Sequence, residues 1–221
     1  MMADGHEHRF SLSFSRIEIL HLAGSVLALT VGFAFVLNDA GDPAKLFPRQ
    51  RFDVPISLYV ASFVAVASGF VLHEMAHKAV AQYYHHWAEF RGYFQGLIMS
   101  LLIAAGIGIL IAAPGAVNIW GRVGPKQNGL ISLAGPGTNF AIASLTFPVA
   151  YFLDVTTPVP NGFAVVASVN AILCLFNLLP IGNLDGRKVL RWSKLVFAAS
   201  LLAAMGLVAL TIVSGVSPMW R

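Results

Sequence analysis

Three residues capable of metal chemistry stand together at positions 73 to 77, where the sequence reads His-Glu-Met-Ala-His. In a helix, residues four positions apart lie on one face, so His73 and His77 can bind a single zinc ion while Glu74 points toward the open side of the metal. Zinc lowers the pKa of a water molecule to about 7 in favourable sites, and a neighbouring carboxylate such as Glu74 can accept the proton. The chemistry that these residues predict is hydrolysis with Glu74 as the general base.

The sequence before this motif is apolar: no Asp, Glu, Lys, Arg or His occurs from position 55 to position 72. One charged side chain at the centre of a membrane-spanning helix costs about 2.5 to 3.5 kcal/mol on insertion scales. Three ionisable groups within five positions therefore need a compensating partner, and a bound metal ion is the partner that their spacing favours.

The composition indicates an integral, multi-pass membrane protein. Of the 221 residues, 57% are hydrophobic and only 11% are charged, and the mean hydropathy is +0.74. Soluble domains are about half apolar and a quarter charged. The net charge of +4 is spread over connecting loops without a dense basic patch, so we expect no nucleic-acid partner. Cys174 is the only cysteine, which excludes an intramolecular disulfide and a thiolate metal cluster.

Apolar blocks of about 20 residues, the length that crosses a bilayer, predict an all-α polytopic fold with five to six transmembrane helices. A sixth apolar stretch, 96–113, is interrupted by Gly106 and Gly108 and leads into a predicted turn and strand at 113–119. We interpret 96–119 as a small re-entrant helix and strand. Residues 1–15 form a polar tail, and no cleavable signal peptide is evident. The five predicted spans are 17–37, 55–84, 129–153, 162–179 and 189–214.

Basic residues indicate the topology, because Lys and Arg in short loops accumulate on the cytoplasmic side. If 96–113 dips into the membrane and returns, most basic residues fall on one side; if it crosses, the asymmetry fades. We therefore predict five spans plus a re-entrant element, with six spans as the alternative, and an active site toward the cytoplasmic side. One side would carry Arg9, Arg16, Arg91, Arg122, Lys126, Arg187, Lys188, Arg191 and Lys194, and the other Lys45, Arg49, Arg51 and Arg221.

A catalytic zinc ion usually has three protein ligands and an open fourth position, so a third ligand is needed. Asp185 is the best candidate. Pro180 and Gly182 break the helix before it, and Gly186 permits a tight turn beside its carboxylate. Zinc, neutral histidines and two carboxylates sum to zero charge, which is easier to bury. The rejected candidates are Asp39, Asp42 and Asp53, in a loop on the other side, and Asp154, at the far end of its helix.

Asparagines are candidates for stabilising the oxyanion that forms during hydrolysis. Asn177 is the first choice and Asn139 the second, although either amide can instead bond a neighbouring helix. Asp185 also has an alternative role, as a helix cap or as a partner for Arg187 or Lys188.

Three motifs occur in order: His-Glu-Met-Ala-His, Ala-Gly-Pro-Gly-Thr-Asn at 134–139, and Phe-Asn-Leu-Leu-Pro-Ile-Gly-Asn-Leu-Asp-Gly at 176–186. With them, the chain resembles the site-2 protease family of intramembrane zinc metalloproteases over about residues 55–190. The resemblance implies that His73, His77 and Asp185 bind zinc, that Glu74 activates water, and that Asn177 supports the oxyanion.

The resemblance also implies that 113–117 forms a strand within the membrane, whose edge can receive an unwound substrate. One departure lies at Asn183 and Leu184, where many members have Asn-Pro or Pro-Leu before the Asp-Gly pair. We expect no PDZ or CBS module.

The function expected from the sequence is an intramembrane zinc endopeptidase with one Zn²⁺ ion per chain, acting on transmembrane segments of other proteins in the lipid bilayer. We expect residues 1–221 to form a single membrane-embedded domain with a catalytic core at about 55–190. The alternatives are a zinc or cation transporter, which would need more polar stations along a path, and a catalytically inactive membrane scaffold.

Overall fold

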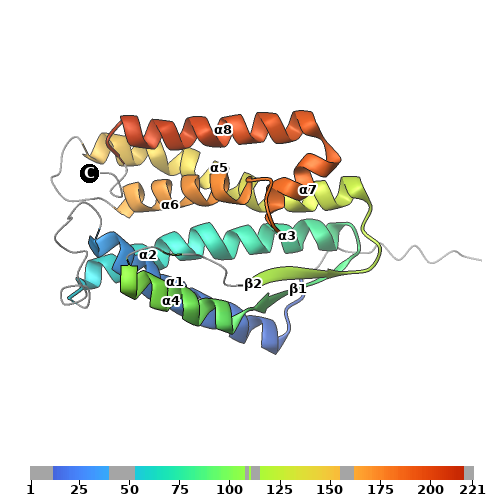
Figure 1. Cartoon of the computed structure of the whole chain (residues 1–221), viewed down its shortest axis with the longest axis horizontal. Coiled ribbons are helices and arrows are strands. Elements are labelled where there is room, and N and C mark those ends of the chain that lie inside the picture. The colour runs from blue at the N-terminus through green and yellow to red at the C-terminus, as the bar shows by residue number, and fades with distance from the viewer. Residues whose placement is uncertain (1–11, 40–52, 108–109, 111–114, 155–161, 217–221) are drawn as a thin grey trace, which may run out of the picture.

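The computed structural model describes residues 12–39, 53–107, 110, 115–154 and 162–216, and within them the chain is mostly helical (Figure 1). The predicted polar tail is thus described only from residue 12. The elements, in chain order, are α1 (Arg16–Asp39), α2 (Ile56–Val66), the π-helical turn η3 (Ala67–Val71), α3 (Leu72–Tyr83), β1 (Trp87–Gly92), α4 (Phe94–Ile107), β2 (Gly115–Trp120), α5 (Pro125–Asp154), α6 (Gly162–Asn177), α7 (Asp185–Trp192) and α8 (Lys194–Val213).

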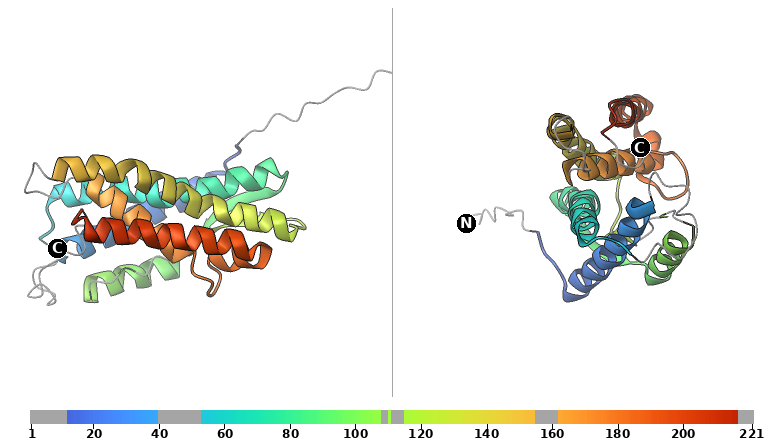
Figure 2. Two further views of the ribbon diagram at one scale, coloured as in Figure 1. Left: turned by 90° about the horizontal axis from the view of Figure 1, so that it is seen from above. Right: turned by 90° about the vertical axis from the view of Figure 1, so that its left-hand side faces the viewer.

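The helices run side by side as a bundle, and α3 lies inside it between α5 on one side and the two strands on the other (Figure 1). The end-on view in Figure 2 shows α4 and α8 on the outside of the bundle. Helix α3, the start of α5, helix α7 and the strands gather at one end of the molecule (Figure 1). This arrangement brings the three motifs of the sequence together.

Four helical segments are long and apolar enough to cross a membrane: Arg16–Asn38, Ile56–Tyr83, Pro125–Leu153 and Lys194–Val213. Helices α4 and α6 are apolar but shorter, with 14 and 16 residues. The helical class is thereby confirmed, with four candidate membrane-spanning helices among the described residues, while the predicted five to six spans and the re-entrant element stay predictions.

The predicted final span, 189–214, is wrong at its start. Helix α7 is a separate eight-residue amphipathic helix that ends at Trp192. At Ser193 the backbone turns extended, and the Ser193 side chain accepts a hydrogen bond from the N–H of Val196, so it caps α8. The break was missed because a single Ser between Trp192 and Lys194 carries no proline or glycine signal.

The span that carries His-Glu-Met-Ala-His is continuous from Ile56 to Tyr83, but it contains a feature that the sequence did not predict. At Ala67–Val71 the helix widens into a π turn, and the N–H of Leu72 bonds the carbonyl of Ala67, five residues back. The Asn170 side chain on α6 donates to Ser68 within this turn at 3.2 Å. Such turns shift the phase of the helix and occur often at functional sites.

The strands β1 and β2 form an antiparallel pair in which Phe90 opposes Val117. Strand β2 agrees with the strand predicted at 113–119, although residues 113 and 114 lie outside the described part of the chain. Strand β1 was not predicted, and the all-α description is corrected to that extent. Trp87 begins this strand. Its six residues include Glu89 and Arg91, so the apolar alternation typical of a strand is weak.

Candidate metal centre and active site

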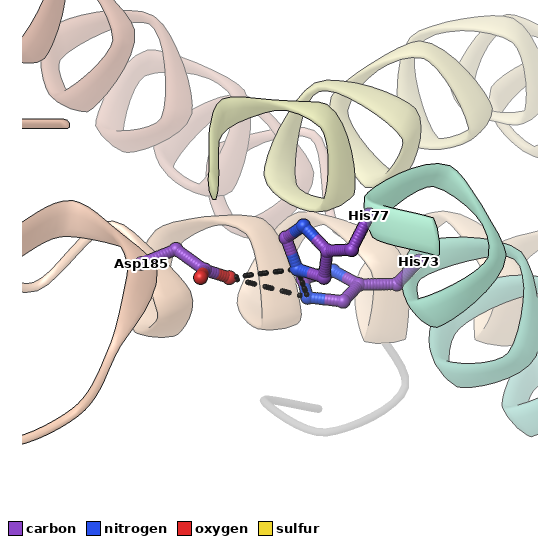
Figure 3. Close-up of side chains that lie close together, drawn as sticks. All are labelled: His73, His77 and Asp185. Carbon is purple, nitrogen blue, oxygen red and sulfur yellow. Dashed lines mark hydrogen bonds and ion pairs between the residues drawn. The ribbon is translucent and has the colours of Figure 1, made fainter. Parts of the chain in front are cut away.

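His73, His77 and Asp185 lie together and buried, and their ligand atoms are all within 4.8 Å of one another (Figure 3). The Nε2 atoms of His73 and His77 are 2.9 Å apart. Oδ2 of Asp185 lies 3.4 Å from Nε2 of His73 and 3.0 Å from Nε2 of His77. The cluster can hold a metal ion with two nitrogens and one oxygen, a ligand set that suits zinc.

The orientation of the His77 ring is set by helix α5. Nδ1 of His77 lies 2.7 Å from the carbonyl oxygen of Ile131, so Nδ1–H donates and Nε2 is left as the ligand atom. A backbone partner of this kind fixes the tautomer of a metal-binding histidine. Nδ1 of His73 is buried and has no hydrogen-bond partner among the described residues. The two histidines are therefore held by different means.

Gly135 brings α5 against the ligand atoms themselves. A Cβ atom at Gly135 would lie 2.4 Å from Nε2 of His77 and 2.6 Å from Nε2 of His73, distances that real atoms do not adopt. By contrast, a Cβ at Gly137 would meet nothing within 4 Å. Of the two glycines in the Gly-Pro-Gly stretch, Gly135 is therefore the one that permits the close contact.

Asp185 reaches the histidines from the first turn of α7. The chain breaks after α6, where Gly182 adopts a φ of +54°, as expected from the Pro180–Gly182 signal. Gly186, however, does not make a tight turn: it lies in the helix, where a Cβ would stand 2.0 Å from the carbonyl oxygen of Leu178. Gly186 is required for close approach of α7 to the end of α6, which brings Asp185 to the cluster.

The charge on Asp185 is strongly favoured. Burial raises the pKa of this carboxyl, but the charge of His77, hydrogen bonds from His73 and His77 and the Lys188 ammonium outweigh burial and hold the pKa far below its ordinary value. Nζ of Lys188 lies 3.2 Å from Oδ1, the oxygen that does not face the histidines. Asp185 can thus present a carboxylate oxygen to a metal ion. The same side chain also pairs with Lys188, the alternative role that was predicted for it.

Glu74 is buried beside the cluster, and its carboxylate is held by the sheet. Oε2 of Glu74 accepts a hydrogen bond from the backbone N–H of Val117 on β2 at 3.1 Å. Both residues line a cavity of about 300 Å³ that also contains the three candidate ligands. A carboxylate, a set of metal ligands and a strand edge therefore share one chamber.

The walls of this cavity differ in character. Toward α1, α2 and α6 the wall is apolar, with Leu29, Phe33, Val66, Phe70 and Leu173. Toward α5, α7 and the end of α6 it is polar, with Asn128, Ser132, Asn177, Asn183 and Lys188.

The two asparagine candidates for oxyanion binding lie in different places. Asn177 lines the cavity, and its Nδ2 donates to the carbonyl of Leu173, one turn earlier, at 3.0 Å. Asn139 is fully buried, does not line the cavity, and has no hydrogen-bond partner for its amide among the described residues. The geometry favours Asn177 over Asn139 for a role in the cavity.

The sequence reasoning missed a buried ion pair one turn beyond Glu74. Lys78 is 1% exposed and pairs with Glu18, which is fully buried in the first turn of α1. The signal was present, because Glu18 is the sole acidic residue of the first apolar segment, 17–37. An acidic residue at the start of a helix is commonly explained by the helix dipole, so its presence did not suggest a specific partner such as Lys78.

A bundle of membrane-length helices that gathers two histidines and two carboxylates around one cavity defines a helical membrane protein with a buried metal-binding site. Comparison with known proteins defines this class more narrowly. Over 203 residues the chain is 34% identical to a protein of Methanocaldococcus jannaschii named "Putative zinc metalloprotease MJ0611", covering 87% of this chain and 93% of the relative.

Two bacterial relatives bear similar names. The chain is 29% identical to "Putative zinc metalloprotease YwhC" of Bacillus subtilis, covering 62% of this chain and 70% of the relative. It is also 29% identical to "Putative zinc metalloprotease Rip2" of Mycolicibacterium smegmatis, covering 60% and 58%. No protein-family model and no solved structure matches the chain. The chain belongs to the site-2 protease family, as the motifs predicted.

Proposed function

We propose that this protein is an intramembrane zinc endopeptidase that hydrolyses peptide bonds within transmembrane segments of other proteins. One observation carries the proposal: the ligand atoms of His73, His77 and Asp185 meet beside Glu74 in a helix of membrane length. The zinc metalloprotease names of the relatives support the same chemistry.

The residues present fit a zinc ion. His73, His77 and Asp185 would hold one ion per chain. The cavity that these residues line leaves room for a further small ligand. The tautomer of His77 is already the one that metal binding requires. When bound, zinc supplies Lewis acidity, which lowers the pKa of a water molecule and polarises the peptide carbonyl.

Glu74 carries the proton in this mechanism. Its carboxylate accepts a proton from the attacking water, whose oxygen forms the new bond to the carbonyl carbon of the substrate. The C–N bond then breaks, and Glu74 returns the proton to the departing amine nitrogen. The hydrogen bond from Val117 engages one oxygen of Glu74 and orients the other.

Asn177 is the proposed donor for the oxyanion. An Asn amide has two N–H groups, and the bond to Leu173 uses one of them. The second can serve a substrate oxygen in the cavity that Asn177 lines.

The substrate would bind as an added strand. The N–H of Val117 points away from β1, because it bonds Glu74, so the outer edge of β2 faces the cavity. A transmembrane segment that unwinds locally can pair its backbone with such an edge, while the N–H of Val117 stays bonded to Glu74. The apolar wall of the cavity suits the side chains of a lipid-embedded substrate.

We also keep the predicted orientation as part of this proposal. The end of the bundle that carries α3, the strands and α7 also carries basic residues: Arg91 in β1, Arg122 between β2 and α5, Lys126 in the first turn of α5, and Arg187 and Arg191 in α7. Under the positive-inside rule this end faces the cytoplasm. The proposed unit is a single membrane-embedded domain with its catalytic core at about 55–190.

The test compares purified wild type with Glu74→Gln on a reporter transmembrane segment in bilayer discs, with bound zinc measured in both. We expect zinc to be retained and cleavage to fall by about 10²- to 10⁴-fold, the range for loss of a general base. Glu89→Gln serves as the matched control, because Glu89 bonds Ser15 and Arg91 outside the cavity. Equal cleavage by wild type and Glu74→Gln would remove the proposed role of Glu74, and zinc that exchanges across vesicles would favour a transporter instead.

A further inference from the structure

Five residues form a closed circuit of contacts around helix α3 and the sheet. Glu74 accepts from the N–H of Val117 at 3.1 Å, and Val117 opposes Phe90 across the two strands. The N–H of Phe90 donates to Oε1 of Glu18 at 3.0 Å. The other oxygen of Glu18 accepts from Nζ of Lys78, which returns the circuit to α3, one turn after Glu74.

In the strand pair at the centre of this circuit, two opposed backbone N–H groups donate to side chains outside the sheet. Opposed residues in an antiparallel sheet either exchange two hydrogen bonds or point their N–H groups away from each other. Phe90 and Val117 are of the second kind, since each N–H bonds a carboxylate outside the sheet. The two-stranded sheet is therefore held between Glu18 on one edge and Glu74 on the other.

The Glu18–Lys78 pair is also isolated from water. Glu18 is fully buried and Lys78 is 1% exposed, and Nζ of Lys78 lies 4.4 Å from the centre of the Phe14 ring. Burying two charges costs more than an apolar pair of similar size, so such a pair is weak evidence for a role in stability alone. A buried carboxylate with one oxygen on an ammonium and the other on a strand amide instead specifies a position.

We propose that Glu18 and Lys78 are positioning residues of the protease: they fix strand β2, where substrate adds, relative to the catalytic base Glu74. The inference rests on the proposed function. Because Glu74 and Lys78 are on the same face of α3, the helix that carries the base also carries the anchor of the sheet. Displacing β1 moves β2 through their pairing, and β2 moves both the bound substrate and the N–H that orients Glu74.

The main experiment uses two double variants that differ in one acceptor. E18Q/K78M removes both charges but keeps an oxygen that can accept from the N–H of Phe90. E18L/K78M also removes both charges and leaves that N–H without an acceptor. We expect E18L/K78M to bind as much zinc as E18Q/K78M but to cleave the reporter segment at least about tenfold more slowly, as for misplaced reacting groups.

Deuterium exchange of backbone amides distinguishes a positioning role from a general effect on stability. Relative to E18Q/K78M, E18L/K78M should show faster deuterium exchange in the peptide containing Val117, more than 20 residues from either substitution, while peptides of α5 and α6 stay unchanged. Equal cleavage, or equal exchange at Val117, in the two variants would overturn the proposal.

A reciprocal measurement does not depend on how the Glu18 variants fold. Glu74→Ala removes the acceptor of the Val117 N–H, whereas Glu74→Gln keeps one. The circuit predicts faster exchange at Phe90 in Glu74→Ala than in Glu74→Gln, although Glu74 does not touch Phe90. Identical exchange at Phe90 overturns the positioning role, whereas absence of cleavage by the wild type would refute the proposed function and leave this exchange test to decide the circuit.

Discussion

Helix α3 carries two pairs of residues at a spacing of four, and the two pairs meet different kinds of neighbour. His73 and His77 face α5 and α7, where the contacts are a backbone carbonyl, the glycine Gly135 and one carboxylate. Glu74 and Lys78 face the strands and α1, where the contacts are charge-assisted hydrogen bonds. We call these the metal face and the strand face.

The difference shows that one helix can position two sets of functional groups in different ways, by close packing on the metal face and by hydrogen bonding on the strand face. On the metal face, close helix contacts leave no space for a side chain, so the ligand atoms are positioned by packing. On the strand face, hydrogen bonds from the N–H groups of Val117 and Phe90 position the carboxylates of Glu74 and Glu18 relative to the sheet. Disturbing the metal face should therefore change zinc binding, whereas disturbing the strand face should change cleavage at constant zinc.

The strongest test of the metal face removes its third ligand. Asp185→Ala leaves two histidine ligands and unpairs Lys188, so we expect the purified protein to lose its zinc and cleavage to become undetectable. Metal analysis and the reporter assay measure the two losses. Asp53→Asn is the matched control, because Asp53 is exposed and lies before α2. Full zinc content in Asp185→Ala would show that the metal is held elsewhere.

Asn177 should give the next largest effect. Loss of an oxyanion donor costs about 2.7 to 4 kcal/mol in a known protease, which corresponds to about 10²- to 10³-fold in kcat. We expect Asn177→Ala to reduce kcat by about 10²-fold with zinc content and KM little changed. Asn170→Ala is not a suitable control because it supports the π turn, so Asn183→Ala, also on the cavity wall, is compared instead. A fall of less than about threefold would assign Asn177 to its bond with Leu173 alone.

Gly135 sharpens the comparison, because it lies on the metal face without being a ligand. Gly135→Ala forces a methyl group against both Nε2 atoms, so we expect zinc affinity to fall by about 10- to 100-fold, as for changes around metal ligands. Competition with a zinc chelator measures this. Gly137→Ala is the control two residues away, where a Cβ meets nothing. If both variants bind zinc as tightly as the wild type, packing does not set the metal face.

The metal face could be predicted from the sequence and the strand face could not. His73, Glu74, His77 and Asp185 belong to short motifs whose chemistry is readable from residue type and spacing, and the structure brings them together. The prediction that Gly186 permits a tight turn was wrong. This glycine instead allows α7 to approach the end of α6, and such packing between helices is not visible in a short motif.

Strand β1, the π turn and the Glu18–Lys78 pair share a different origin. Each depends on a partner distant in sequence: β1 needs β2, the π turn contacts Asn170, and Lys78 meets Glu18 sixty positions earlier. Local propensity and periodicity contain no term for such partners. A lysine near a helix end ordinarily extends to the lipid headgroups, so residue type and position alone do not indicate that Lys78 is buried.

The smallest expected effect tests the strand face directly at Val117. Val117→Pro deletes the N–H that donates to Glu74, whereas Val117→Ala keeps this N–H and also removes the branched side chain. Because this N–H points away from β1, proline at this position removes no hydrogen bond between the strands, so β2 should persist. Glu74 then keeps its place in α3 but loses the bond that orients its carboxylate.

We expect Val117→Pro to cleave about tenfold more slowly than Val117→Ala, with equal zinc content, because an orienting hydrogen bond contributes about 1 kcal/mol or slightly more. Steady-state cleavage and metal analysis on the two variants provide the comparison. A loss of zinc in Val117→Pro would mean that the two faces of α3 are not independent. Equal cleavage would mean that Glu74 is oriented by its helix alone, in which case the strand serves only the substrate.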